Sequence, residues 1–453
     1  MQSMQYHIRT FGCQMNHSDS EKIMTFLEKN GFRLADNITQ ADLIIFNTCG
    51  VRQAAEDRVF GQIHNLKKQE TKNKKQATIV LTGCLANRKD VRKKLQDKVN
   101  FFLPIKEIEN IISIIKSKTG KPSRKNNPNP NSSIQDPLSG REQISYLSIK
   151  PKYTTGFSAY VPIMNGCNNF CAYCVVPYAR GRESSRPAEA IIQEIKSLIR
   201  DSYKEIILLG QNVNSYQSAE NGKTVNFSHL VRKINALPGK FWIQFVSNHP
   251  KDVTDEMIET VARCKKVCES FHLPIQAGND KVLFQMNRKY TAKQYLRLIK
   301  KIKAAYEKFK PGVPYAISSD IIVGFPGETK KQFLDSAKIM KEVKFDMVYF
   351  GQYSSRPGTA AWKMKDNVSK KEKACREKYL NGILKKTALE NNRKYLGKIL
   401  EILIQKEKDG FCFGKTRTLK NIRIPLEGKT LTGKFVKAEI IKANPWNIEG
   451  RIR

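Results

Sequence analysis

The chain has 453 residues, more than one ordinary hydrophobic core accommodates, which predicts about two to four domains. A mean hydropathy of -0.50, no apolar run near the ~20 residues of a spanning helix and no secretory-type N-terminus argue against a membrane or exported protein, so we expect a cytoplasmic location and no membrane partner. The net charge of +38 favours a polyanionic partner such as nucleic acid, although a lysine-biased proteome would produce the same excess.

Residues 1–118 alternate strand-like and helix-like segments, and short apolar strands between helices predict an N-terminal parallel α/β domain. A cysteine follows each of three predicted strands: Cys13 follows 5–11, Cys49 follows 43–46 and Cys84 follows 78–81. In such sheets ligands bind beyond the carboxyl ends of the strands. We therefore expect the three cysteines to converge in space. Three ordinary buried cysteines are the alternative.

Local signals set the boundaries of the next segments. The helix after the first strand is expected to begin at the capping residues 18–20 (Ser-Asp-Ser) and to end at Asn30-Gly31. Residues 119–150 are expected to form a linker, because 119–141 are rich in Pro, Asn and Ser.

Residues 151–388 repeat a strand–helix unit six times, which predicts a partial (β/α)6 barrel. The predicted strands are 158–163, 205–209, 241–246, 271–275, 315–323 and 347–353. Amphipathic helices are expected at 188–199 and 292–305, and a charged helix at 363–393. Residues 389–453 then switch to short β-like runs at 399–404, 411–413, 422–425, 435–441 and 448–453. The fold class is therefore α/β, followed by a small C-terminal β-barrel.

The most informative stretch is a loop with the spacing C-x3-C-x2-C, formed by Cys167, Cys171 and Cys174. Three thiolates can hold three irons of a 4Fe-4S cube and leave the fourth iron open to a small molecule. The alternative is a zinc loop that borrows a fourth ligand. The next histidines, His229 and His249, are too distant in sequence to favour it.

Several segments resemble one known family. They are GCNNFCAYC at 166–174, CVVPYARGRESSR at 174–186, LLGQNVNSY at 208–216, DIIVGFPGE at 320–328, TFGCQMN at 10–16, NTCGVR at 47–52 and TGC at 82–84. On these motifs the chain is identified as a member of the methylthiotransferase family of radical S-adenosylmethionine enzymes, and GQNVNSY is typical of its MiaB branch. Two segments depart from the family pattern, VSNHP at 246–250 and SSD at 318–320.

The resemblance covers nearly the whole chain apart from the linker and implies its cofactors and partners. It implies a radical S-adenosylmethionine barrel at 151–388 and a TRAM RNA-binding module at 389–453. It also implies two 4Fe-4S clusters and S-adenosylmethionine, with tRNA, an electron donor of flavodoxin or ferredoxin type and a sulfur donor as partners of a monomer. One cluster would lie on Cys13, Cys49 and Cys84 and the other on Cys167, Cys171 and Cys174.

The implied reaction is methylthiolation of carbon 2 of N6-isopentenyladenosine next to the tRNA anticodon. One S-adenosylmethionine would methylate sulfur at the first cluster. The other would give a 5′-deoxyadenosyl radical at the second, and such chemistry suits a C–H bond that no acid or base ionises.

Contact residues are expected at the strand ends and on the basic surface. Gln211, Asn212 and Gln276 are the candidate ligands of S-adenosylmethionine, because amides both donate and accept hydrogen bonds. No catalytic side chain is assigned. Phosphate contacts are expected from the segment 180–186 and from Lys415, Arg417, Lys420, Arg423, Lys434 and Lys437. Three aromatic residues of the terminal barrel are expected in its core: Phe411, Phe413 and Phe435.

Two alternative functions remain open on the sequence. The same chemistry could act on threonylcarbamoyl-adenosine in tRNA or on a ribosomal protein. A protein of another class, a non-catalytic RNA-binding protein with structural zinc, would share the basic charge and the cysteines.

Overall fold

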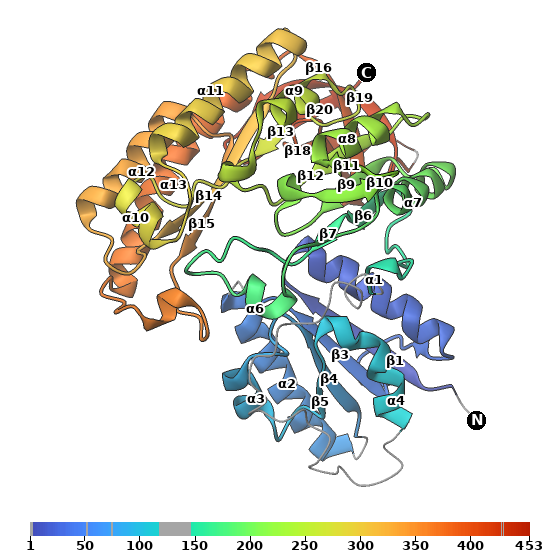
Figure 1. The fold of residues 1–453 in the computed structure, drawn as a ribbon. Helices are drawn as coiled ribbons and strands as arrows, with labels where there is room; N and C mark the ends of the chain where they lie inside the picture. The colour runs from blue at the N-terminus through green and yellow to red at the C-terminus, as the bar shows by residue number, and fades with distance from the viewer. Residues whose placement is uncertain (1–2, 51–52, 74–75, 117–145, 427, 429) are drawn as a thin grey trace.

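The computed structural model describes residues 3–50, 53–73, 76–116, 146–426, 428 and 430–453. They form the predicted α/β domain, central barrel and small β-barrel (Figure 1). Residues 119–145 of the predicted linker lie outside the described part of the chain. No described helix is both long and apolar enough to cross a bilayer.

The N-terminal domain is built on a parallel five-stranded sheet in the order β2-β1-β3-β4-β5. The strands are β1 (Gln5–Phe11), β2 (Arg33–Leu34), β3 (Leu43–Thr48), β4 (Thr78–Gly83) and β5 (Phe101–Phe102), and the helices are α1 (Gln14–Lys29), α2 (Gln53–Asn73), α3 (Lys89–Leu95), η1 (Ile105–Asn110) and α4 (Ile111–Lys116). β3 is buried along its whole length, as expected for a central strand covered on both faces. Tyr146 and Leu147 pack into the same core as Tyr6 and Ile23.

Helix α1 begins earlier than predicted. Cys13 is its N-cap residue, and residues 18–20 lie inside the helix. The expected capping role is wrong because a tertiary contact takes the most polar of these side chains: Asp19 accepts a hydrogen bond from Arg180 of the central barrel. The predicted end is confirmed, since α1 stops directly before Asn30.

The central barrel consists of six parallel strands in two adjacent sheets, ordered β6-β9-β12 and β13-β14-β15. The strands are β6 (Ser158–Pro162), β9 (Glu205–Leu209), β12 (Trp242–Phe245), β13 (Ser270–His272), β14 (Ala316–Val323) and β15 (Met347–Gln352), and the main helices are α7 (Ala188–Arg200), α8 (Phe227–Ala236), α9 (Asp255–Arg263), α11 (Ala292–Phe309), α12 (Lys330–Val343) and α13 (Lys370–Arg393). Among the described residues, an isolated β-bridge pairs Ile243 of β12 with Val267, just before β13, and so links the two sheets. Within the described residues, no strand pairing connects β6 to β15, so the barrel is partial as predicted.

The N-terminal domain covers part of the interior of this barrel. Ile206 and Leu208 of β9 pack into the main core, so the alternate side chains of that strand face the interior. Two of these, Ile207 and Leu209, pack against Met15 of α1. An apolar contact between domains therefore shields the interior from water.

The C-terminal residues form a closed five-stranded barrel in the order β16-β17-β18-β20-β19. Its strands are β16 (Ile399–Lys408), β17 (Phe411–Thr416), β18 (Asn421–Pro425), β19 (Phe435–Ala443) and β20 (Ile448–Ile452). In β17 the residues Cys412, Gly414 and Thr416 are buried, and the alternate ones are half-buried. Phe411 and Phe413 are thus on the outer face, and the prediction that they are core residues is wrong. Phe435 is also half-buried and lies outside the core of the small barrel, where it packs against Trp242 of the central barrel.

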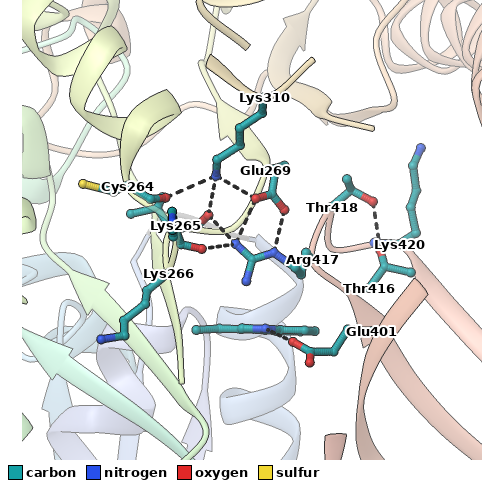
Figure 2. Close-up of polar contacts among 12 residues, drawn as sticks. Cys264, Lys265, Lys266, Glu269, Lys310, Glu401, Thr416, Arg417, Thr418 and Lys420 are labelled. Atoms are coloured by element: carbon teal, nitrogen blue, oxygen red, sulfur yellow. Dashed lines mark hydrogen bonds and ion pairs between the residues drawn. The ribbon is translucent and has the colours of Figure 1, made fainter. Parts of the chain in front are cut away.

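A buried charged cluster docks the small barrel onto the central one (Figure 2). Arg417 donates from Nε to Glu269 Oε2 and from Nη2 to Glu269 Oε1, both at 2.8 Å. Lys310 Nζ donates to the same carboxylate at 2.7 Å. We call Glu269, Lys310 and Arg417 the docking cluster. Beside it, the Trp242 indole N–H donates to Glu401 Oε1 at 3.1 Å.

Candidate functional site

Three neighbouring strands bring the first three cysteines together. Cys49 and Cys84 directly follow β3 and β4, and Gly12 separates Cys13 from β1. The Cys49 and Cys84 amides each donate to the adjacent strand, at 2.8 and 2.9 Å, which fixes their alignment. A Cβ atom on Gly12, whose φ is +139°, would lie 2.4 Å from the Cys49 Cβ. The turn before Cys13 therefore requires glycine.

The surroundings of this triplet favour a thiolate at Cys13. A hydrogen bond with Cys49 lowers the pKa of Cys13 to about 6; burial opposes this shift, and the positive charge of Arg180 assists it. Arg180 ends α6 (Val176–Arg180), a helix of the central barrel that lies against the N-terminal domain (Figure 1). Its Nη2 donates to Asp19 Oδ2 at 2.6 Å, and both side chains are buried. The guanidinium charge beside the triplet is thus paired with a carboxylate.

The second triplet lies on a loop that the barrel holds at several points. The Cys167 amide donates to the Gly181 carbonyl at 3.1 Å. The Ala172 amide donates to the Met286 carbonyl at 2.9 Å, and the Ala172 carbonyl accepts from the Ala361 amide at 2.8 Å. The protein's own backbone therefore sets the conformation of this loop.

Burial and hydrogen bonds act in opposite directions on these thiols. Burial raises the pKa of Cys167 to about 11 and, with the neighbouring Cys171, raises the pKa of Cys174 to about 12. Each sulfur also accepts a hydrogen bond: Cys167 from Asn169 Nδ2 at 3.5 Å, Cys171 from Arg288 Nη1 at 3.3 Å and Cys174 from Val176 N at 3.5 Å. Donors of this kind stabilise the thiolates that a metal requires.

The two triplets meet at the boundary between the domains. A Cβ atom on Gly50 would lie 3.2 Å from Cys84 Cβ and 3.3 Å from Val175 Cγ2, which follows the second triplet. Cys84 is also close enough to Cys174 to contribute to its raised pKa. No three His, Cys, Asp or Glu side chains of the described residues surround a single-ion position. Each triplet instead offers three thiols, the donor set that fits a 4Fe-4S cluster with one open iron.

Unpaired buried polar atoms gather beyond β9 and β12. Four of them lack a hydrogen-bond partner within the described structure: Gln211 Oε1, Asn212 Oδ1, Asn248 Oδ1 and His249 Nε2. The two loops adjoin, because the Val213 amide donates to the Ser247 carbonyl at 3.1 Å. His249 Nδ1 accepts from the Lys251 amide, so Nε2 carries the ring proton. Buried groups of this kind are ordinarily satisfied, and here they offer a donor and acceptors to a polar ligand.

Gln276 lies beyond β13, on the other sheet of the barrel. Its φ of +70° is in the left-handed region that residues other than glycine rarely adopt. The amide of Gln276 donates to the Asp320 carbonyl and its carbonyl accepts from Ile322, both at 2.9 Å. The structure therefore places Gln211 and Asn212 together and Gln276 beyond a strand of the other sheet.

Sequence reasoning missed the charged groups beside the two triplets. Arg180 lies in the segment 174–186 but is expected there to contact phosphate, Asp19 is expected to cap a helix, and Arg288 lies in no quoted motif. Their approach to the thiols depends on tertiary structure. The unpaired atom of His249 was likewise not indicated by the sequence. A buried polar residue beside a predicted strand end was the only available signal.

Five of the predicted phosphate contacts pair with carboxylates, Arg423 with Glu449 in a partly exposed pair and the other four in more buried ones. Arg180 pairs with Asp19, and Arg186 pairs with Glu194 at 2.6 Å. Arg417 belongs to the docking cluster, and Lys420 pairs with Asp346 at 2.6 Å. Burial in ion pairs removes these cations from the surface that RNA could reach. The other four predicted cations of the small barrel are exposed or half-buried: Lys415, Arg423, Lys434 and Lys437.

Three family models match separate parts of the chain. Residues 5–103 match "Uncharacterized protein family UPF0004", residues 161–340 match the radical SAM superfamily and residues 393–452 match the TRAM domain. Two solved structures share the fold at low sequence identity. The radical S-adenosylmethionine methyltransferase TsrM from Kitasatospora setae has a TM-score of 0.55 at 14% identity, over 79% of this chain and 75% of that one. The cobalamin-dependent S-adenosylmethionine radical enzyme OxsB has a TM-score of 0.53 at 10% identity, over 84% of this chain and 56% of that one.

Full-length relatives carry one shared name, tRNA-2-methylthio-N(6)-dimethylallyladenosine synthase. The protein from Clostridium botulinum (strain Langeland) is 39% identical, covering 98% of this chain and 96% of its own. Those from Thermoanaerobacter pseudethanolicus and Clostridium novyi are 38% and 40% identical, each over 99% of this chain and over 93% and 96% of their own. The resemblance predicted from the motifs is therefore confirmed: this chain belongs to the family of tRNA-2-methylthio-N(6)-dimethylallyladenosine synthases.

Proposed function

We propose that this chain places a methylthio group on carbon 2 of N6-isopentenyladenosine (N6-dimethylallyladenosine) next to the anticodon of tRNA. The family relationship supports the reaction. The observation that carries the proposal is the approach of the two cysteine triplets at a domain boundary, where Cys84 Cβ and Val175 Cγ2, next to Cys174, lie 3.2 and 3.3 Å from the position of a Cβ atom on Gly50. A reaction that combines a sulfur carrier with a radical source needs both within one site.

Each triplet is proposed to hold one 4Fe-4S cluster. Cys13, Cys49 and Cys84 would hold the first, and Cys167, Cys171 and Cys174 the second. When bound, the clusters and S-adenosylmethionine supply the one-electron chemistry that an unreactive C–H bond requires.

The barrel would bind and shield the small substrate. Gln211, Asn212 and Gln276 are proposed ligands of S-adenosylmethionine, and the unpaired acceptors of the first two are available to its amino group and ribose hydroxyls. His249 Nε2 adds a donor suited to a carboxylate. The contact of Met15 with Ile207 and Leu209 helps exclude water from the barrel interior.

The outer face of the small barrel is proposed to contact tRNA. The Arg423 guanidinium lies 4.6 Å from the Phe411 ring centroid, and Lys406 Nζ lies 5.4 Å from that of Phe413. Lys415 follows on the same face of β17. Cations beside aromatic rings suit phosphates and stacked bases together. The docking contacts reach one end of this face, because Leu403, which pairs with Lys415 across the strands, packs against Trp242 of the central barrel.

Other partners follow from the proposed chemistry. The enzyme would act as a monomer in the cytoplasm, with a flavodoxin- or ferredoxin-type electron donor and a separate sulfur donor. Its domains would comprise residues 1–118, 151–388 and 389–453.

Iron and sulfide quantitation tests the cofactor assignment. The anaerobically reconstituted wild type is expected to hold about eight irons per chain, and Cys167→Ala and Cys49→Ala are each expected to lose about half. Cys375→Ala, at an exposed thiol of α13, is the matched control and keeps the full content. A wild type that binds zinc in place of iron contradicts the proposal and favours a non-catalytic RNA-binding protein.

Mass spectrometry of tRNA nucleosides tests the substrate. Incubation with undermodified tRNA, S-adenosylmethionine, sulfide and a reductant should yield 2-methylthio-N6-isopentenyladenosine. A methylthio derivative of threonylcarbamoyl-adenosine, or a modified ribosomal protein, would assign the chain another substrate of the same chemistry.

The RNA-binding face is tested by the salt dependence of tRNA affinity. Lys415→Ala should weaken binding and reduce the slope of log affinity against log salt by about one unit per lost phosphate contact. Lys300→Ala, at an exposed position of α11, is the control. Equal slopes for the two variants would exclude this face.

A further inference from the structure

Arg288 is a buried cation without a carboxylate partner among the described residues. Its exposed fraction is 7%, and no ion pair of the described structure includes it. Nε donates to the Tyr290 hydroxyl at 2.8 Å and Nη2 to the Pro274 carbonyl at 3.0 Å. Nη1 donates to Cys171 Sγ at 3.3 Å. The guanidinium is thus hydrogen-bonded directly beside the second triplet, but no carboxylate of the described residues pairs with its charge.

Burying a charge is unfavourable unless an opposite charge accompanies it. A hydroxyl and a carbonyl provide dipoles, not a counter-charge. The sulfur at Nη1 is the one position in this set that becomes anionic, because a metal-bound cysteine is a thiolate. The Cys171 thiolate, as the ligand of a cluster, would therefore supply the counter-charge that Arg288 lacks.

The other triplet shows the opposite arrangement. Arg180 also lies near thiols, those of Cys13 and Cys84, but Asp19 neutralises it at 2.6 Å. Arg288, which contacts Cys171, therefore keeps its charge, whereas Arg180 beside the other triplet is paired. The carboxylate of Glu183 also acts at the second triplet, but on Cys167, where it accepts from the Asn168 amide at 3.2 Å.

We propose that Arg288 makes the cluster on Cys167, Cys171 and Cys174 easier to reduce and so directs the electron to the site that cleaves S-adenosylmethionine. In this step the cluster gains one electron from a one-electron reductant, which is oxidised by one, and no bond forms or breaks. The nearby positive charge stabilises the more negative, reduced state. Arg288 is a positioning residue, since it acts through the Cys171 ligand. The inference rests on the proposed function, because it requires a cluster at this triplet.

The test is an anaerobic redox titration followed by electron paramagnetic resonance, on the reconstituted full chain carrying Cys49→Ala so that one cluster signal remains. At the midpoint potential of this parent, Arg288→Gln is expected to lower the ratio of reduced to oxidised cluster at least tenfold, which corresponds to 59 mV for one electron. Arg288→Lys keeps the charge and should change the ratio less than threefold. Arg182→Gln removes an exposed charge near the loop and should change it less than twofold, because solvent screens such charges.

The outcomes separate this inference from the proposed function. An unchanged ratio in Arg288→Gln at full iron content overturns the role of Arg288 and leaves the cluster assignment intact. A parent that binds no iron refutes the proposed function itself. If Arg288→Gln loses its iron, the melting temperatures of the apo proteins provide the test. Apo Arg288→Met should melt no lower than the apo wild type, because an unneutralised charge has been removed. A lower melting temperature would show that the protein alone satisfies Arg288 and would overturn the inference.

Discussion

Removal of the Glu269 carboxylate should undock the small barrel from the central one. Glu269 is 4% exposed and pairs with both Arg417 and Lys310. In Glu269→Ala the two cations stay at the interface without a counter-charge. Truncating the cation instead, in Arg417→Ala, leaves Glu269 paired with Lys310. The carboxylate is therefore the more sensitive position of the docking cluster.

The structure sets the order of the expected losses. Breaking a buried ion pair by removing one partner costs about 3–5 kcal/mol, which applies to Glu269→Ala. Arg417 is 25% exposed and its loss removes charge-assisted hydrogen bonds, so Arg417→Ala should cost about 1.5–3 kcal/mol. Arg423→Ala is the matched control, since Arg423 is 41% exposed and its pair with Glu449 is worth about 0–1 kcal/mol.

Tryptophan fluorescence can report the docking directly. Trp242 is 1% exposed, and its ring centroid lies 4.9 Å from that of Phe435 in the small barrel. The other two tryptophans, Trp362 and Trp446, are exposed, so replacing both with Phe leaves Trp242 as the single reporter. Undocking should shift its emission to longer wavelength, and a urea titration gives the free energy of the transition. The reasoning is refuted if Glu269→Ala undocks no earlier than Arg423→Ala, or if Arg417→Ala costs more than Glu269→Ala.

Three further predictions concern pH, a turn and a domain contact. Burial raises the pKa of Glu269, but Arg417 and Lys310 outweigh it and hold the pKa below its ordinary value. The docking free energy should therefore have its full value above about pH 4.3 and fall as the pH drops through the lowered pKa. Trp242 emission reports this dependence, which should be lost in Glu269→Gln. Gly12→Ala should abolish iron binding at the first triplet, because its Cβ would meet Cys49. Gly61→Ala in α2 meets nothing within 4 Å and should raise the unfolding free energy by about 0.5–1 kcal/mol. Iron content and urea unfolding measure the two effects, and a full iron content in Gly12→Ala would contradict the prediction for Gly12. Asp19→Ala should cost about 3–5 kcal/mol in urea unfolding, since it leaves Arg180 buried and unpaired; a loss below about 1 kcal/mol would show that Arg180 finds another partner.

Strand positions were predictable because burial imposes a simple pattern on the sequence. The runs 43–46 and 206–209 are continuously apolar, which is typical of strands covered on both faces, and both lie in parallel sheets. The cysteines at strand ends could be expected to converge for the same reason. Parallel strands place their carboxyl ends at one edge.

Features that depend on tertiary partners could not be predicted. Asp19 is of a residue type that commonly caps helices, but its partner Arg180 is 161 residues away. Arg417 is of a residue type that commonly contacts phosphate, but it pairs with Glu269, which lies 148 residues away in another domain. Phe411 was expected in the core because a short aromatic run does not reveal which alternate side chains face outward. In each case a distant partner or the direction of a strand decided the outcome.

The alignment of β1, β3 and β4 limits how this protein can change in evolution. A residue inserted within one of these strands would displace everything beyond it by about 3.3 Å and turn each side chain to the opposite face. Substitutions inside the strands can keep their length, whereas insertions and deletions there would separate Cys49 or Cys84 from its neighbours. Changes in length should therefore accumulate at the far edge of the sheet, where the strands begin.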